Sequence, residues 1–203
     1  MRADAIVFGV AGALFGIIVG WVLGSQQAAR AVRETAPVAQ AAPAQQQQQQ
    51  AAAPQAVPLD PARVKALEET AGKDPKDVQA RVQLGNMYFD AEQYPQAIQW
   101  YEQALTLNPN DPNVSTDLGV AFYYTNQPDK ALAQFDQSLK VDPKHIKTLL
   151  NVGIVRAFGK QDLPGAGRAW QQVVDLSPNS PEGQAARKGL EGIKAAHPDS
   201  AGK

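Results

Sequence analysis

The chain contains no cysteine and only two histidines among its 203 residues. Without cysteine it has no disulfide, no thiolate metal ligand and no thiol nucleophile. Neither His145 nor His197 stands at a spacing typical of a metal site or of an activated nucleophile. The lack of cysteine fits any cellular compartment and therefore identifies none.

An excess of charge of one sign is also missing. Lys and Arg together number 19 and Asp and Glu 20, a net charge of −1, and no region is basic enough to suggest a phosphate backbone as partner. Gly165 and Gly167 lack the lysine and the preceding strand of a phosphate-binding loop. We therefore predict that the protein is not an enzyme and has no catalytic residue, no cofactor, no metal site and no nucleic-acid partner.

What the chain does contain is divided unevenly along its length. Residues 1–24 are almost all apolar, residues 25–58 are mostly Ala, Gln and Pro, and residues 59–203 mix charged and apolar residues as a globular domain does. The 19 residues from Ala5 to Leu23 carry no charge. At about 1.5 Å per residue, a helix of that length crosses the hydrocarbon core of a membrane.

A cleavable signal peptide is the alternative interpretation of this first segment. Its apolar region would normally be about 7–15 residues long and would end at a site of small residues, and residues 22–24 would serve as such a site. The apolar run is longer here, and Trp21 stands at its far edge as an interfacial anchor would. We expect residues 1–24 to form a transmembrane signal-anchor helix.

Glycine recurs at every fourth position of the expected membrane helix, at Gly12, Gly16, Gly20 and Gly24. Missing side chains along one stripe let a second helix approach closely, which is a main source of affinity between helices in lipid. The stripe predicts a homo-oligomer packed through these four residues. The alternative is that glycine is simply common in membrane helices.

Residues 25–58 carry six consecutive glutamines and four prolines. Such a stretch has too little apolar surface to offset its ordering entropy, so we expect a disordered linker that acts as a tether. Basic residues are nearly balanced on the two sides of the expected membrane helix, and the low charge of the linker favours its export. We expect a single-pass protein of the bacterial inner membrane with its C-terminal domain in the periplasm.

A pattern with a period of 34 residues runs through the second half of the chain. An apolar residue followed by glycine marks each copy, at Leu84-Gly85, Leu118-Gly119 and Val152-Gly153, and three positions later stand Tyr88, Phe122 and Arg156. Each copy then continues with a small residue, an aromatic residue, a compact residue and a proline: Ala97, Tyr101, Ala104 and Pro109; Ala131, Phe135, Ser138 and Pro143; Ala166, Trp170, Val173 and Pro178.

This ladder resembles the tetratricopeptide repeat. The resemblance implies an all-α, right-handed superhelical solenoid of helix–turn–helix units, with the small residues letting paired helices approach and the aromatic residues filling the space between them. The domain at 59–203 would comprise a flanking helix at 60–72, repeats at 78–111, 112–145 and 146–179, and a capping helix at 181–196. The third repeat should be the least regular, because residues 161–165 hold one extra residue.

In this family the first helix of each repeat lines a concave groove through its second, fifth, ninth and twelfth residues. The resemblance therefore implies a groove of aromatic and aliphatic side chains with few charges, which suits a protein or peptide client. The alternative is that some of these side chains pack against the C-terminal helix. The positions are Gln79, Val82, Asn86 and Phe89; Asn113, Thr116, Val120 and Tyr123; Lys147, Leu150, Ile154 and Ala157.

Some members of the family bind acidic C-terminal tails through a clamp of Lys, Asn and Arg side chains. Only Asn86 and Lys147 match that clamp here, while Val82, Asp117 and Asn151 occupy its other positions. A carboxylate at Asp117 would repel the carboxylates of such a tail. We predict that the protein does not bind acidic tails in this way.

These features together predict a membrane-tethered scaffold that binds a protein or peptide client in the groove. A more specific version resembles envelope repeat proteins of cytochrome c maturation, which hold apocytochrome tails. Two alternatives remain from the sequence. One is a self-assembling structural protein of the envelope, joined through the glycine-striped helix, and the other is a secreted soluble adaptor released by signal peptidase.

Overall fold

The computed structural model describes residues 57–196. The expected membrane helix at 1–24, with its glycine stripe, lies outside the described residues, and so do most of the expected linker and His197. Among residues 57–196, none of the helices combines the length and the apolar character needed to span a bilayer.

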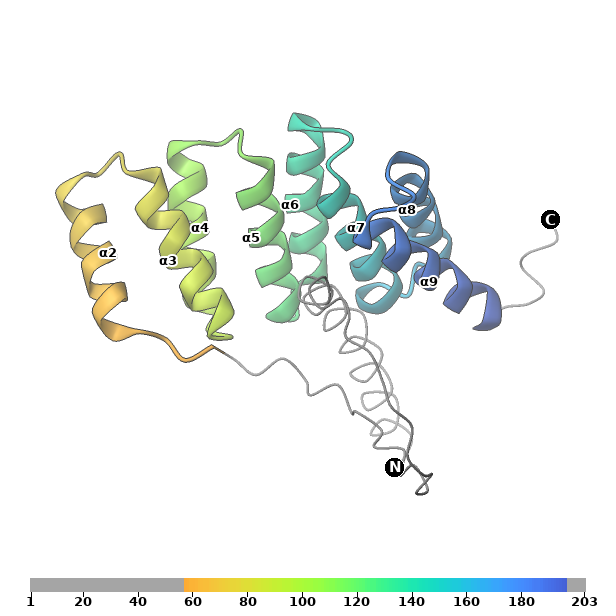
Figure 1. Cartoon of the computed structure of the whole chain (residues 1–203), viewed down its shortest axis with the longest axis horizontal. Helices are drawn as coiled ribbons and strands as arrows, with labels where there is room; N and C mark the ends of the chain where they lie inside the picture. Colours follow the sequence, from red (N-terminus) through yellow and green to blue (C-terminus); the bar gives the residue numbers. More distant parts are fainter. Residues whose placement is uncertain (1–56, 197–203) are drawn as a thin grey trace, which may run out of the picture. The chain divides into compact units, whose positions relative to one another are not determined.

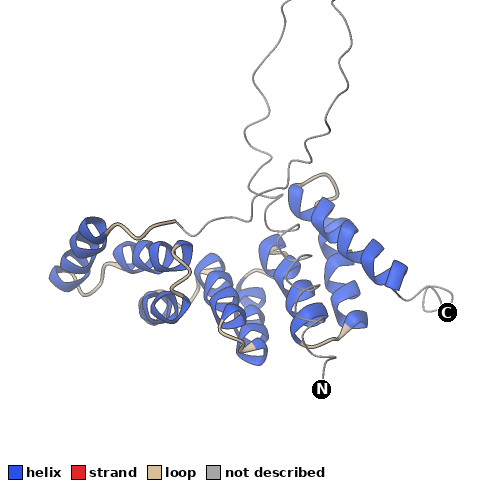
Figure 2. Ribbon diagram, turned by 90° about the horizontal axis from the view of Figure 1, so that it is seen from below, coloured by secondary structure: helices blue, strands red, loops and turns tan. Residues whose placement is uncertain are grey.

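Helices joined by short loops make up the described part of the chain (Figure 2). Its regular elements follow one another as α2 (Pro61–Lys73), α3 (Val78–Asp90), α4 (Tyr94–Leu107), α5 (Pro112–Tyr124), α6 (Pro128–Val141), α7 (Ile146–Ile154), the π-helical turn η1 (Val155–Gly159), α8 (Leu163–Leu176) and α9 (Pro181–Ala196).

The helices lie side by side in chain order, from α2 to α9 (Figure 1). The most extensive contacts join α3 to α4, α5 to α6 and α8 to α9, and each further helix packs mainly on its neighbours in the chain. In a solenoid of stacked repeats, each repeat contacts only the repeats next to it. The prediction of an all-helical solenoid is confirmed.

Aspartate side chains cap the first turns of α2, α3 and α5. The carboxylate of Asp60 accepts hydrogen bonds from the first turn of α2, at 3.0 Å from Ala62 N and 3.2 Å from Arg63 N. Asp77 and Asp111 cap α3 and α5 in the same way. These contacts satisfy backbone N–H groups that have no partner inside the helix.

Each repeat packs an aromatic ring from its second helix onto a glycine of its first. A methyl group built on Gly85 would overlap the ring of Tyr101, and one on Gly119 would overlap Phe135. Both rings are almost completely buried, at 1% and 0% exposure. The glycines therefore set the distance between paired helices, as the sequence pattern implied.

The same contact recurs in the third repeat between Gly153 and Trp170. The indole Nε1 of Trp170 also donates a hydrogen bond to the Leu150 carbonyl, at 3.2 Å. Trp170 is only 2% exposed, and this hydrogen bond gives its buried N–H group a partner inside the core.

The extra residue of the third repeat lies inside its first helix. The turn between the two helices contains one residue with positive φ in each repeat: Glu92, Asn126 and Gln161. It comes 14 residues after the start of the first helix in the first two repeats and 15 in the third. The prediction of an extra residue at 161–165 is therefore wrong. The π-helical turn η1 absorbs the extra residue earlier in the chain, where Lys160 N donates a hydrogen bond to Val155 O.

A salt bridge closes this irregular turn. Arg156, where the other repeats have an aromatic residue, contacts the Asp162 carboxylate at 2.6 Å. Asp162 also accepts a hydrogen bond from Gly165 N at 2.8 Å and so caps α8. The hydrogen bonds from Gly165 and Arg156 hold the pKa of Asp162 below its usual value. The arginine therefore has a structural partner in place of the aromatic packing that it replaces.

Candidate client-binding groove

Eight of the twelve predicted groove positions are accessible on the first helices α3, α5 and α7. Four of them are exposed and four are half-buried. The exposed residues are Gln79, Asn86, Asn113 and Lys147, and the half-buried ones are Val82, Phe89, Val120 and Tyr123. The accessible positions belong mainly to α3 and α5.

The other four positions are buried, and we correct the prediction for them. Leu150, Ile154 and Ala157 are 9%, 6% and 7% exposed. Both α5 and α9 pack against α7, and η1 packs on α8, so this part of the third repeat is covered by its neighbours. Thr116 is completely buried for a different reason, which is a hydrogen-bond cluster.

The buried hydroxyl cluster joins the second repeat to the third. Thr148 Oγ1 lies 2.6 Å from Thr116 Oγ1 and 2.7 Å from Ser138 Oγ. Both partner hydroxyls also reach the Pro112 carbonyl, at 2.6 and 2.9 Å. His145 closes the cluster from its edge, with Nδ1 at 2.6 Å from Thr148 Oγ1. Thr116 is therefore a core residue and not a contact for a client.

Replacing Thr148 by valine should lower the free energy of unfolding by about 1–3 kcal/mol. Valine keeps the shape of the side chain but leaves the buried hydroxyls of Thr116 and Ser138 with one partner fewer. Urea unfolding followed by circular dichroism measures the loss. Thr106→Val is the matched control, because Thr106 is exposed and bonds only to Glu102 O in its own helix. Equal losses in the two variants would contradict a role for the cluster.

An aromatic cluster lies where α3 and α5 meet the start of α4. The rings of Tyr94 and Tyr124 are stacked, with centroids 4.6 Å apart and planes at 9°. Phe89 meets both rings edge-on, at 5.3 and 5.9 Å. Tyr123 adjoins Tyr124 at 6.1 Å. The sequence predicted Phe89 and Tyr123 but missed Tyr94, which lies at the start of a second helix, where the family pattern puts no groove residue.

A single ion pair bridges α5 and α7. Lys147 Nζ lies 3.4 Å from Asp117 Oδ1, and the side chains are 57% and 28% exposed. In the first repeat, Asn86 Oδ1 on α3 accepts a hydrogen bond from the Tyr101 hydroxyl on α4 at 2.8 Å. The two residues that match the acidic-tail clamp thus already have partners within the domain.

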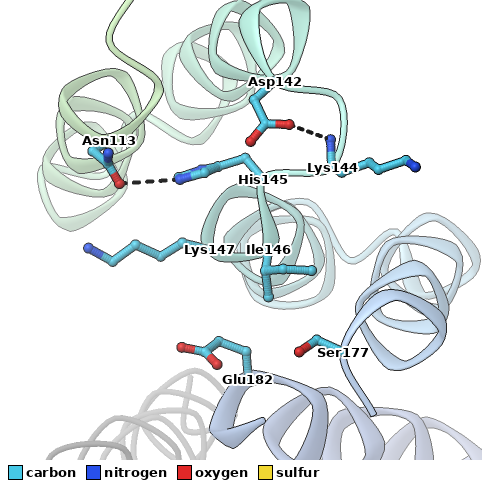
Figure 3. Close-up of a pocket in the computed structure, with 8 residues that line it drawn as sticks. All are labelled: Asn113, Asp142, Lys144, His145, Ile146, Lys147, Ser177 and Glu182. Carbon is cyan, nitrogen blue, oxygen red and sulfur yellow. Dashed lines mark hydrogen bonds between the residues drawn. The ribbon is translucent and has the colours of Figure 1, made fainter. Parts of the chain in front are cut away.

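A polar pocket of about 370 Å³ opens beside this ion pair (Figure 3). The side chains of Asn113, His145 and Lys147 approach it from one side, while Ser177 and Glu182 face them from the end of α8 and the start of α9. Within the group, His145 Nε2 lies 3.2 Å from Asn113 Oδ1. The full lining is Asn113, Asp142, Lys144, His145, Ile146, Lys147, Ser177 and Glu182. Its lysines, histidine and carboxylates leave it with groups of both charge signs.

Histidine and carboxylate side chains do not gather in a metal-binding group anywhere in residues 57–196. Every buried side-chain nitrogen and oxygen in that range has a hydrogen-bond partner. The described surface therefore offers contacts along helix faces and no enclosed, unsatisfied polar site.

The fold and this surface define a helical repeat protein that presents side chains along a row of first helices. A family model described as TPR repeat matches residues 85–126, and one described as Tetratricopeptide repeat matches residues 116–181. The chain contains tetratricopeptide repeats. A comparison with curated proteins gives no match.

Solved structures of such repeats are similar to the described domain. The TPR domain of Sgt2 from Aspergillus fumigatus is 27% identical, with a TM-score of 0.55 over 62% of this chain and 82% of that chain. The first TPR domain of human RPAP3 is 24% identical, with a TM-score of 0.56 over 63% and 97%. The first TPR of Spaghetti (RPAP3), solved with an HSP90 peptide, is 23% identical, with a TM-score of 0.52 over 70% and 98%. The two RPAP3 comparisons show the fold alone.

Proposed function

We propose that the protein is a membrane-tethered scaffold that holds a protein or peptide client against the first helices of its repeats. The observation that carries this proposal is the face formed by α3 and α5, where aromatic, aliphatic and amide side chains stay accessible. Phe89, Val120 and Tyr123 are half-buried while Gln79 and Asn86 are exposed. Aromatic side chains on a rigid surface are common anchors of protein interfaces.

Two further considerations support a client-binding role. Tetratricopeptide repeats hold a peptide in the RPAP3 structure solved with an HSP90 peptide. The row of stacked helices from α2 to α9 also supplies an extended binding surface. The membrane tether rests on the sequence of residues 1–58 alone, and with it the expected bacterial inner-membrane location.

Changing Phe89 and Tyr123 together to alanine should reduce client capture by roughly tenfold or more, because truncating two anchor residues commonly removes several kcal/mol of binding free energy. The measurement is affinity capture from membranes with the full-length chain, quantified by mass spectrometry. A variant with Leu107 and Val141 changed to alanine is the matched control. These residues are 39% and 42% exposed at the ends of α4 and α6.

Circular dichroism must show both variants to be folded before capture is compared. Unchanged capture by the α3–α5 variant would refute the groove, and equal loss in both variants would point to a general effect of removing apolar surface. Crosslinking of the wild-type chain in membranes separates the scaffold from the self-assembling alternative. Crosslinks only between copies of this chain would favour self-assembly through the glycine stripe.

A further inference from the structure

Asp117 is a carboxylate with an incomplete set of partners. It lies on α5 with 28% of its side chain exposed, and its contact with Lys147 Nζ at 3.4 Å is the single ion pair formed with it among residues 57–196. Charge-assisted hydrogen bonds between ammonium and carboxylate groups are commonly about 2.7–2.9 Å long. The Asp117 carboxylate is therefore partly exposed, and its one ionic contact within residues 57–196 is a long one.

The surroundings of Asp117 do not offset the partial burial of its carboxyl group. Burial raises the pKa of the Asp117 carboxyl, and the nearby Asp111 carboxylate raises it further. Lys147 and His145 act in the opposite direction, yet the pKa remains above its usual value. Lys147 is a long and mostly exposed side chain, so another cation can take its place at low cost.

A basic group from a client would complete this position. We propose that Asp117 receives a lysine or arginine side chain of the client, so that the scaffold selects a basic segment where related clamps hold an acidic tail. This inference rests on the proposed function and adds the chemistry of the client. The partly buried carboxylate supplies charge complementarity, and the half-buried Val120, one turn further along α5, supplies an adjacent apolar surface.

An unbiased selection tests the sign of the charge. A random twelve-residue peptide library displayed on phage is selected against the full-length chain, and in parallel against Asp117→Asn. We expect the wild-type chain to enrich peptides with a lysine or arginine at a recurrent position, and the variant to lose that enrichment. Enrichment of acidic peptides by the wild-type chain would overturn the inference.

Matched synthetic peptides then give the size of the effect. For an enriched peptide, fluorescence anisotropy should show about tenfold weaker binding to Asp117→Asn, in the range expected for one hydrogen bond between charged groups. Replacing the basic residue of the peptide by glutamine should cost a similar factor on the wild-type chain and little on the variant. Asp136→Asn, on exposed surface of α6, is the control and should leave the affinity unchanged.

Lys147→Met provides a second and opposite test. A basic client competes with Lys147 for the Asp117 carboxylate, so removing the lysine should strengthen binding of the basic peptide by a few-fold. An acidic client would instead lose a favourable charge and bind more weakly. Weaker binding of the enriched peptide to Lys147→Met would therefore contradict the inference.

A stability measurement distinguishes recognition from a structural role. Because the folded-state pKa of Asp117 is raised, its ionised form destabilises the fold above that pKa, and the penalty disappears as the pH falls towards the ordinary value of 3.8. Asp117→Asn should therefore be more stable than the wild-type chain at pH 7, and the advantage should shrink on acidification. A loss of stability at pH 7 would assign Asp117 to the structure and overturn the inference.

The selection also separates this inference from the proposed function. Some enriched peptides could need Phe89 and Tyr123 yet bind Asp117→Asn as well as the wild-type chain. That result would support the groove and refute the role of Asp117. A selection that yields no peptide dependent on Phe89 and Tyr123 would count against both. Loss of binding in both Asp117→Asn and the Phe89 and Tyr123 variant supports both.

Discussion

Replacing Phe135 by alanine should lower the free energy of unfolding by about 3–5 kcal/mol. The ring is 0% exposed and lies directly on Gly119 in the central repeat. Its removal leaves a cavity that the paired helices α5 and α6 cannot fill without losing other contacts. Urea unfolding followed by circular dichroism should show a lower midpoint. This is a large part of the stability of an ordinary domain, about 5–15 kcal/mol.

Phe158→Ala makes the same chemical change at the surface. Phe158 is 37% exposed in η1, so its truncation should change stability far less than that of Phe135. The comparison separates the effect of losing a buried ring from the effect of losing any phenylalanine ring. Similar shifts of the urea midpoint in the two variants would contradict the assignment of Phe135 to the core.

Replacing Gly119 by leucine should cost at least the upper end of the about 1–3 kcal/mol found for overpacked cores. Even a methyl group on Gly119 would overlap the Phe135 ring, and leucine adds three further carbons. The gain in helix propensity, about 1 kcal/mol at most, is too small to compensate. Thermal and urea unfolding both report the loss.

Gly72→Leu is the matched control for this substitution. Gly72 lies in α2, and nothing lies within 4 Å of a methyl group built there. Leucine should therefore stabilise α2 slightly through its better helix propensity. Opposite signs at the two glycines would identify packing as the cause, whereas destabilisation of similar size at both would contradict it.

The sequence predicted the architecture because its signal repeats. Gly85, Gly119 and Gly153 stand at one register with Tyr101, Phe135 and Trp170, and the structure pairs them ring on glycine. A single copy of such a pattern would be ambiguous between core helix and chance. Three copies at nearly the same spacing fix which helix packs on which, since each unit buries its apolar face only against its neighbours.

The groove was predicted less completely, because contacts between different repeats decide which of its residues are accessible. Leu150 and Ile154 occupy groove positions by register, but whether they are covered depends on how α9 and α5 meet α7. Thr116 is buried because its hydroxyl bonds to Ser138 and Thr148, which lie 22 and 32 residues further along the chain. Tyr94 joins the aromatic face through stacking on Tyr124, a contact with no counterpart in the repeat pattern. The position of a residue in the repeat pattern predicts which way its side chain points. It does not predict which residues from other repeats pack against that side chain.

The π-helical turn η1 shows how a repeat protein can accommodate an inserted residue. One additional residue entered the third repeat, and Arg156, Asp162 and Lys160 close the bulge within a single turn. Asp162 caps the start of the next helix, α8, and Trp170 still packs on Gly153. An insertion that would shift the register of a strand is here confined to the end of one helix. Repeat arrays can therefore gain single residues within helices, as well as in loops, without losing the phase of the units that follow.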